Sequence, residues 1–350
     1  MRRRQFLTTT VALAAPSIAR AQSSRVLKII PEGDLAILDP VWTTATVARN
    51  HGYMVFDTLY AMDADFQIQP QMAAGHVIEN DGKLWTITLR DGLKFHDGEP
   101  VRGRDAVASI RRYAARDSFA RSLMDVTDEL SAPDDRTIRF RLKKPFALLA
   151  AALGKPGTPM PCIMPERLAL TDPNKQVTEM IGSGPFRFLT AERVAGSRVA
   201  YARNDAYVPR PDGVASFTAG PKRVLIDRVE WHVIPDSSTK INALMNNEVD
   251  WIQDPPADLL DTLRANKRLT VAPMDPAGGI SILRFNTLFP PFDNPAIRRA
   301  LFGAVDQAEF MTASLGDDRR LWKDRVAVFS PGTPMDQGTG LEVMTGKRDL

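Results

Sequence analysis

The last third of the chain alternates short strand patterns with helix patterns. Arg228 to Pro235 alternates apolar and polar side chains, and it leads into a helix pattern that can be capped between Asp236 and Ser238 and ends at Asn246-Asn247. The elements expected after it are a strand at 249–252, a helix at 258–266, strands at 268–274 and 280–286, and a helix at 294–306. Because strands that alternate with helices usually include parallel pairs, this order predicts an α/β fold.

The first half of the chain shows shorter elements of both kinds. We expect strands at 26–30 and 136–142, and helices at 43–59 and 105–113. Thr43 or Thr44 is a candidate cap for the first of these helices. Between them, Lys83 to Phe95 predicts a hairpin, because apolar and polar residues alternate up to the turn dipeptide Asp91-Gly92.

The amino terminus has the composition of an export signal. Residues 1–21 read MRRRQFLTTTVALAAPSIARA, with an arginine cluster, an apolar run and the small-x-small site Ala19-Arg20-Ala21. Arg3-Arg4-Gln5-Phe6-Leu7 resembles the core of a twin-arginine signal. The apolar run is shorter than the ~20 residues of a membrane span, and Pro16 interrupts it. We therefore expect residues 1–21 to direct export to the periplasm, by the twin-arginine route rather than the general one.

The net charge argues against a nucleic-acid partner, and the cysteine content excludes an intramolecular disulfide. The whole sequence carries a net charge of +3, but four arginines and no acid lie in residues 1–21, so the remainder has a net charge of −1. That balance indicates no nucleic-acid-binding surface. Cys162 is the single cysteine, so no intramolecular disulfide can form.

Motifs of enzymes are missing from the sequence. There is no GxSxG, HExxH, GxxxxGK[ST] or CxxC, and the four histidines are far apart. Cys162 lies between two prolines without an activating neighbour, which favours an inert thiol. We expect no catalytic residue, no cofactor and no metal site, although folding could still gather distant ligands.

His96-Asp97 is the pair that most resembles acid–base machinery. It is followed directly by Gly98, and Asp-Gly is a turn dipeptide. Adjacent residues on a strand point to opposite faces, which disfavours direct cooperation between the two side chains. The pair is therefore predicted to form a turn with a structural role.

Several stretches in a fixed order resemble one protein family. They are LRDGLKFHDGEPVRGRDAVASI (89–110), IGSGPFRF (181–188), YARNDAYVP (201–209), ALMNNEVDWI (243–252), LRFNTLFPPFDNPAIRRALFGAVDQ (283–307) and SPGTPM (330–335). Together they resemble the peptide/nickel/opine class of extracellular solute-binding proteins, family 5, the receptors of ABC importers. Arg102 stands where that family usually has a capping threonine, and Asn247 where it usually has glycine. Both departures are mild.

The resemblance implies a periplasmic-binding-protein-like clamp of two lobes, of the large class II type. Lobe one would comprise residues 24–65 and 180–278, with an extra subdomain inserted at 66–179. Lobe two would begin at 279 and continue to 350. Members of the family extend well past the position of Leu350, so we expect the second lobe to be incomplete in this sequence.

In such a clamp the ligand lies between the lobes, where open α/β sheets present the ends of their strands. The residues that we expect at the ligand are Trp42, Thr43, Thr44, Thr46, Arg49, Asn50, Tyr53, Trp251, Asp254, Arg284 and Asn286. Trp42 and Tyr53 could equally belong to the core. Arg284 and Asn286 could belong to the hinge.

The function implied by the resemblance is capture of a peptide or peptide-like small solute and its delivery to a membrane permease. The partners implied are that solute and the ABC permease, which would hold a monomeric receptor at the membrane periphery. A haem or metal-chelate carrier of the same superfamily is one alternative, and an exported hydrolase is another.

Overall fold

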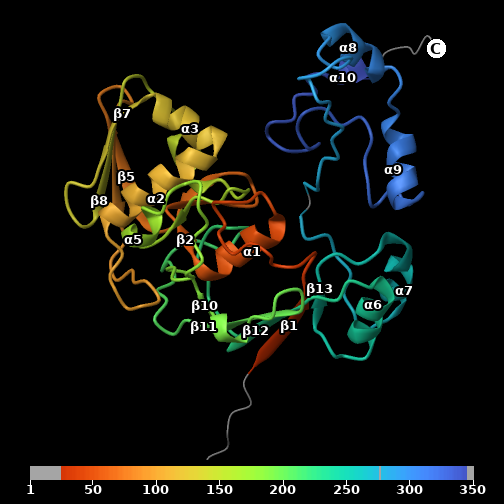
Figure 1. The fold of residues 1–350 in the computed structure, drawn as a ribbon, viewed down its shortest axis with the longest axis horizontal. Helices are drawn as coiled ribbons and strands as arrows, with labels where there is room; N and C mark the ends of the chain where they lie inside the picture. Colours follow the sequence, from red (N-terminus) through yellow and green to blue (C-terminus); the bar gives the residue numbers. More distant parts are fainter. Residues whose placement is uncertain (1–24, 276, 345–350) are drawn as a thin grey trace, which may run out of the picture.

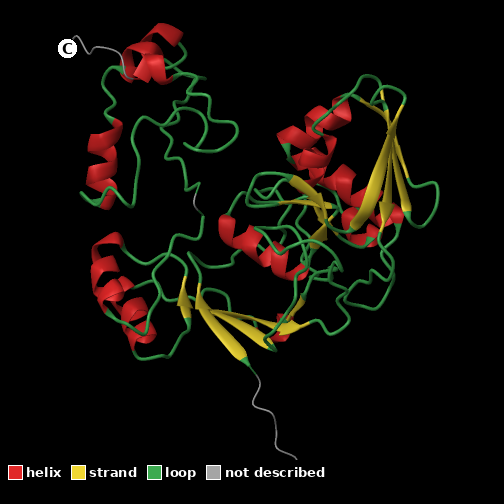
Figure 2. Cartoon of the chain, turned by 180° about the vertical axis from the view of Figure 1, so that it is seen from behind, coloured by secondary structure: helices red, strands yellow, loops and turns green. Residues whose placement is uncertain are grey.

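The computed structural model describes residues 25–275 and 277–344 (Figures 1 and 2). The expected export signal, residues 1–21, lies outside the described residues. Two main sheets account for most of the strands, and the carboxyl-terminal segment, blue in Figure 1, lies apart from both of them in the two views. No helix among the described residues is long and apolar enough to cross a membrane.

A five-stranded mixed sheet is built around strand β1 (Val26–Ile30). Its strands, in spatial order, are β10 (Phe186–Phe188), β11 (Arg198–Arg203), β12 (Arg228–His232), β1 and β13 (Trp251–Ile252). Strand β1 pairs in parallel with β12 on one side and β13 on the other, so Ile29 lies opposite both Trp231 and Trp251. The predicted α/β character and the strand patterns that define β1, β12 and β13 are confirmed.

A four-stranded antiparallel sheet comes from the region between residues 73 and 142. Its strands, in spatial order, are β5 (Ala73–Glu79), β6 (Leu84–Leu89), β8 (Thr137–Leu142) and β7 (Thr127–Ser131). The alternation in β6 is confirmed, because Trp85, Ile87 and Leu89 are all buried.

The predicted hairpin across Asp91-Gly92 is wrong. Strand β6 pairs with β5 on one side and β8 on the other, so neither edge is open to residues 93–95. Gly92 does make the turn, with φ of 76°. The chain after it forms only an isolated bridge between Lys94 and Pro100.

Two small ladders and five helices complete this part of the chain. The ladders pair β2 (Asp57–Thr58) with β9 (Cys162–Ile163), and β3 (Tyr60–Met62) with β4 (Ile68–Pro70). The helices are α1 (Thr46–Val55), α2 (Gly103–Arg116), α3 (Ser118–Asp125), α4 (Leu149–Gly154) and α5 (Glu166–Ala169). The helix expected at 105–113 corresponds to α2, whose first turn is closed by a 2.8 Å hydrogen bond from Arg102 N–H to Asp105 Oδ2.

Helix α1 is shorter than the predicted range of 43–59. It ends at Val55 because Phe56 is extended and β2 begins at Asp57. Ala45 occupies the N-cap position, so neither expected threonine caps the helix. The Thr43 hydroxyl instead accepts a 3.1 Å hydrogen bond from Ala45 N–H within the preceding loop.

Helices α6 (Ser237–Met245) and α7 (Leu260–Ala265) follow the predicted pattern. Asp236 caps α6 by accepting a 2.7 Å hydrogen bond from Thr239 N–H. The helix stops where expected, because Asn247 adopts the left-handed conformation, with φ of 58°. Helix α7 is preceded by a 3₁₀ turn at Ala257–Leu259.

The strands predicted at 268–274 and 280–286 are not formed. A strand needs a neighbouring backbone to pair with, and neither segment has one in the described part of the chain. Ile282 is 72% exposed and Leu283 is 67% exposed, so packing does not support the segment at 280–286 either. In the segment at 268–274, Leu269 and Val271 pack against the buried cluster that contains Ile30 and Ile252, without forming a strand.

Beyond this region the structure contains α8 (Pro295–Phe302), α9 (Gln307–Leu315) and α10 (Leu341–Met344). The helix expected at 294–306 corresponds to α8, capped by Asn294, but it ends at Phe302 because Gly303 forms its C-cap.

Candidate ligand-binding site

Helix α1 meets the carboxyl end of strand β13 through two side-chain amides. The parallel strands β1 and β13 end side by side, and the N–H of Gln253 donates a 3.0 Å hydrogen bond to the carbonyl of Ile30. The side chain of Asn50, on α1, donates to Oε1 of Gln253 at 3.5 Å. Two of the predicted regions, α1 and the segment after β13, therefore lie together. Open α/β sheets bind ligands at this kind of edge.

Arg49 is fixed in place by its neighbour on α1. Its Nε and Nη2 atoms both donate to Oδ1 of Asn50, at 3.3 and 3.1 Å. The side chain is half-buried, and no ion pair formed among the described residues includes it. The buried residues of α1 are Val47, Ala48, His51, Gly52 and Val55. Arg49 and Asn50 thus lie outside the buried face of the helix.

The loop before α1 is held by groups from α2 and from the segment after α4. The guanidinium carbon of Arg116 lies 4.4 Å from the centre of the Trp42 ring, and Arg116 also donates to the Trp42 carbonyl at 3.2 Å. The Thr158 hydroxyl donates to the Thr44 carbonyl at 2.9 Å. Thr46 is the first residue of α1 and is half-buried. These contacts give the loop a defined path into the helix.

Tyr53 lies deeper than the rest of the predicted set. Its hydroxyl oxygen is buried and has no hydrogen-bond partner among the described residues. The ammonium of Lys222 lies 5.3 Å from the centre of its ring. Burial raises the pKa of Tyr53, so the phenol is neutral at physiological pH.

The remaining predicted residues fall into two groups. Trp251, 39% exposed, and Asp254, also exposed, lie at β13 beside Gln253. Arg284 and Asn286 are exposed in the unpaired segment before α8, where Asn286 Oδ1 accepts a 3.1 Å hydrogen bond from Leu288 N–H. Within the described residues, no hydrogen bond or ion pair joins these last two to α1 or β13.

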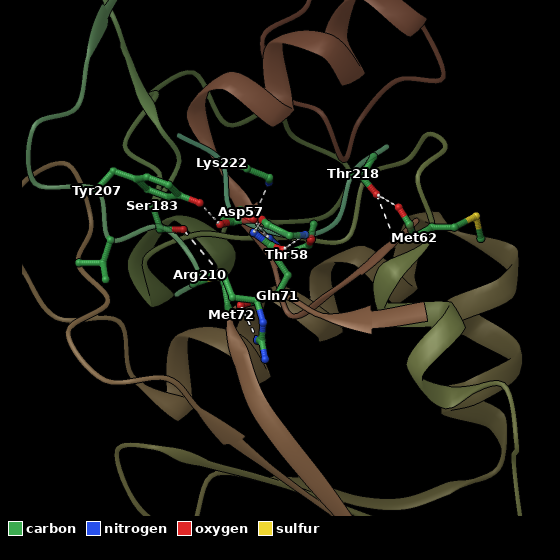
Figure 3. Close-up of polar contacts among 12 residues, drawn as sticks. Asp57, Thr58, Met62, Gln71, Met72, Ser183, Tyr207, Arg210, Thr218 and Lys222 are labelled. Carbon is green, nitrogen blue, oxygen red and sulfur yellow. Dashed lines mark hydrogen bonds and ion pairs between the residues drawn. The ribbon is translucent and has the colours of Figure 1, made fainter. Parts of the chain in front are cut away.

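The sequence analysis missed a buried polar cluster around Asp57. Asp57 is 1% exposed, and Lys222 and Tyr207 converge on its two carboxylate oxygens (Figure 3). The ammonium of Lys222 lies 2.8 Å from Oδ1, and the Tyr207 hydroxyl donates to Oδ2 at 2.8 Å. The backbone N–H of Thr58 adds a 3.0 Å hydrogen bond to Oδ1. The carboxylate is therefore both paired and hydrogen-bonded.

The same cluster fixes the long loop at 204–222 against β3 and the start of β5. Gln71 exchanges two hydrogen bonds with the backbone of Gly220, at 3.1 and 3.3 Å. Arg210 donates to the carbonyl of Ala73 at 2.8 Å, and the Thr218 hydroxyl bonds both backbone groups of Met62 at 3.0 Å. Figure 3 shows Gln71, Arg210, Thr218 and Met62 around Asp57. The cluster connects segments about 150 residues apart.

A signal for this cluster was present in the stretch YARNDAYVP. Asn204 donates to the Gly184 carbonyl at 3.0 Å, and Tyr207 reaches Asp57. The Asn-x-x-Tyr element of the resemblance therefore holds two separate stretches of the chain together. Nothing near Asp57 in the sequence indicates that Tyr207 and Lys222 would meet there.

His96 connects the stretch 89–110 to the glycines of IGSGPFRF. Its Nε2 donates to the Gly184 carbonyl at 3.1 Å, and its Nδ1 accepts from Gly182 N–H at 3.3 Å. Burial lowers the pKa of His96 to about 4, so the ring is neutral at pH 7. Asp97 Oδ1 accepts instead from Glu99 N–H at 3.1 Å. The turn interpretation of His96-Asp97 is confirmed.

The other candidates for chemistry do not form a reactive group. Cys162 is buried in β9, and burial raises the pKa of its thiol, as expected for an inert cysteine. The described residues bring no three His, Cys, Asp or Glu side chains together in an arrangement that could hold a metal ion.

Comparison with known proteins identifies the family. Residues 67–334 match the family described as bacterial extracellular solute-binding proteins, family 5 Middle. The chain belongs to this family. The resemblance drawn from the motifs is thereby confirmed.

Two curated relatives illustrate the similarity. A probable peptide ABC transporter periplasmic-binding protein of Sinorhizobium fredii is 39% identical over 345 residues, which cover 95% of this chain and 63% of that protein. A glutathione-binding protein of Pectobacterium atrosepticum is 25% identical over 308 residues, which cover 87% of this chain and 56% of that protein. The chain thus spans between about half and two thirds of the length of these relatives.

Solved structures of binding proteins share the fold. One is the periplasmic binding protein AgaA of A. tumefaciens R10 in complex with agropinic acid, with a TM-score of 0.67 and 24% identity, covering 83% of this chain and 56% of that one. Another is a dipeptide-binding protein of Pseudoalteromonas sp. SM9913 in complex with Met-Leu, with a TM-score of 0.64 and 21% identity. The match covers 83% of this chain and 59% of that one. The mixed α/β architecture is therefore that of the periplasmic binding proteins.

Proposed function

We propose that the protein is the solute-binding receptor of an ABC importer and that it captures a peptide or peptide-like small solute. Membership of the solute-binding family supports this proposal. The observation that carries it is the contact between Asn50 of α1 and Gln253 after β13, which places polar side chains at the carboxyl ends of parallel strands. Capture by binding alone requires shape and a few placed polar groups, and no activated nucleophile.

The proposal assigns the five-stranded sheet and its helices to lobe one, residues 24–65 and 180–278. Residues 66–179 form the inserted subdomain, and residues from 279 onward begin lobe two. Closure of two lobes around the solute would bury it and create the surface that the permease recognises. The receptor would act in the periplasm as a monomer, without enzymatic activity.

A thermal-shift titration of the full-length gene product tests this function. The solutes are Met-Leu, glutathione and agropinic acid, with haem and the nickel–histidine complex for the carrier alternative. A solute at one hundred times its dissociation constant should stabilise the folded state by about 2.7 kcal/mol. Binding of haem or nickel–histidine alone would favour the alternative carrier. Turnover of peptide or ester substrates without any stabilisation would contradict a receptor.

A further inference from the structure

Arg49 contacts a different kind of group from three other arginines that are buried or half-buried. Arg112 forms a buried ion pair with Asp39 at 2.6 Å, and the half-buried Arg228 contacts two glutamates. Arg90 fills its donors with backbone carbonyls. Arg49 instead contacts a neutral amide oxygen, that of Asn50. Its positive charge is therefore not compensated by a carboxylate of the described chain.

Part of this guanidinium is free to bind a further group. Nε and one hydrogen of Nη2 are used by Asn50, whereas Nη1 has no acceptor among the described residues. Nη1 is also not among the buried polar atoms that lack a partner, so it reaches solvent. Partial removal of a charged group from water is unfavourable unless an anion compensates it. An anionic group of a ligand would supply that compensation.

The surroundings of Arg49 hold its plane in a defined orientation. Asn50 accepts from it with Oδ1 and donates with Nδ2 to Gln253, so the guanidinium is connected through Asn50 to the end of β13. A planar guanidinium with fixed orientation matches a carboxylate through two parallel hydrogen bonds. Exposed acids at the same strand ends, Glu32 and Asp254, form no ion pair in the described chain. The edge is thus suited to a solute that carries a carboxylate and an ammonium group.

We propose that Arg49 is a specificity-determining residue that binds a carboxylate of the solute. The protein then selects solutes with that free carboxylate over the corresponding amides or esters. This inference rests on the proposed receptor function, because it assigns a role to one residue of the same site. It adds the chemical class of the solute, which the fold alone does not supply.

The test is a double-mutant cycle between protein and solute, measured by calorimetric titration of the full-length gene product. The probes are Met-Leu with its carboxamide, and glutathione with its glycyl ethyl ester. For wild-type protein we expect the free acid to bind at least about tenfold tighter than the blocked form of at least one probe. In Arg49→Gln the acid should lose that advantage, while affinity for the blocked form stays within about twofold.

Arg187→Gln is the matched control. Arg187 lies on β10, at the opposite edge of the same sheet, and its guanidinium also donates to an asparagine oxygen, Oδ1 of Asn204 at 3.4 Å. This variant should keep the wild-type ratio of acid to blocked-form affinity. A ratio that falls equally in both variants would overturn the specific role of Arg49.

The remaining outcomes separate this inference from the proposed function. Wild-type protein that binds neither these probes nor any solute named for the receptor function would overturn both. Wild-type protein that binds acids and blocked forms equally, or an unchanged ratio in Arg49→Gln, would overturn only the role of Arg49. Circular dichroism checks folding of each variant. If Arg49→Gln does not fold, Arg49→Lys is measured instead. Lysine keeps the charge but lacks the planar guanidinium, so the ratio of acid to blocked-form affinity must fall below the wild-type value.

Discussion

The hydroxyl of Tyr207 lies 2.8 Å from Oδ2 of Asp57, although the two residues are 150 positions apart in the chain. Lys222 completes the contact from the other end of the same loop, with its ammonium 2.8 Å from Oδ1. The loop at 204–222 is therefore anchored at both ends on one buried carboxylate. The path of this loop depends on compensation of the Asp57 charge by Lys222.

Lys222→Met should destabilise the fold strongly. The substitution leaves the Asp57 carboxylate buried without its cation, and breaking such a pair costs about 3 kcal/mol or more of unfolding free energy. Urea unfolding followed by circular dichroism measures the loss. Arg141→Met is the control, because Arg141 pairs with Asp128 at 2.8 Å on the surface, where both side chains are about half exposed. We expect about 1 kcal/mol or less there. Equal losses in the two variants would contradict the buried role of Asp57.

Local sequence signals predicted those elements whose formation depends on nearby residues. Helix α6 begins at its Asp236 cap and ends at left-handed Asn247, and both signals lie within the segment itself. Strand β6 shows the alternation of its buried face for the same reason. The contact between α1 and β13 was anticipated only as a shared region of the family fold, since the Asn50–Gln253 pair spans 203 positions.

Contacts between distant segments explain the predictions that failed. The Asp91-Gly92 turn is real, but β8 takes the edge of β6 that a hairpin would need, and β8 lies about fifty residues further along. The apolar pattern at 280–286 indicates a strand, yet strand formation requires a partner that the described chain does not place beside it. Asp57, Tyr207 and Lys222 form a cluster only after folding. The Asn-x-x-Tyr element marks Tyr207, but nothing in the sequence pairs it with Asp57 or Lys222.

Gly182→Ala should disrupt the packing of IGSGPFRF against the end of α1. A methyl group at position 182 would lie 2.1 Å from the Val55 carbonyl oxygen and 2.6 Å from the Phe56 ring. Because the nearest of these atoms is backbone, the structure cannot relieve the clash by rotating one side chain. We expect a loss of at least about 2–3 kcal/mol of unfolding free energy, measured by thermal or urea unfolding.

Gly75→Ala is the control for this substitution. A methyl group there would meet no atom within 4 Å, and Gly75 does not have a positive φ. Its unfolding free energy should change by less than about 1 kcal/mol. A Gly182→Ala protein as stable as Gly75→Ala would show that the two segments are not in close contact.

Stability should decrease as the pH falls below about 6.5, because His96 is held neutral in the fold. Burial lowers its pKa from 6.5 to about 4. Between these values the unfolded chain binds a proton that the folded chain does not. The stabilisation that neutral His96 provides is therefore complete above pH 6.5. Below that pH the unfolding free energy decreases by roughly 1.4 kcal/mol per pH unit, down to about pH 4. Burial lowers the pKa of His51 to about 3, so this residue acts in the same direction.

His96→Gln isolates this contribution. Glutamine does not titrate, and its amide can donate to Gly184 and accept from Gly182 as the ring does. We expect a modest loss at pH 7 and a shallower decline of unfolding free energy between about pH 6.5 and pH 4, measured by urea unfolding across that range. A wild-type slope in this variant would mean that His96 does not titrate in the window. Affinity for solute should change less than stability.

Export should depend on the arginine pair at the amino terminus. Residues 1–21 lie outside the described structure, so this prediction rests on the sequence MRRRQFLTTT. Arg3→Lys together with Arg4→Lys preserves the positive charge but removes the pair that the twin-arginine route reads. The protein should then accumulate in the cytoplasm with its signal uncleaved, as measured by fractionation and immunoblotting. Arg2→Lys is the control and should leave export unchanged. Normal export of the double variant would assign the protein to the general secretory route, because that route requires only positive charge before the apolar run.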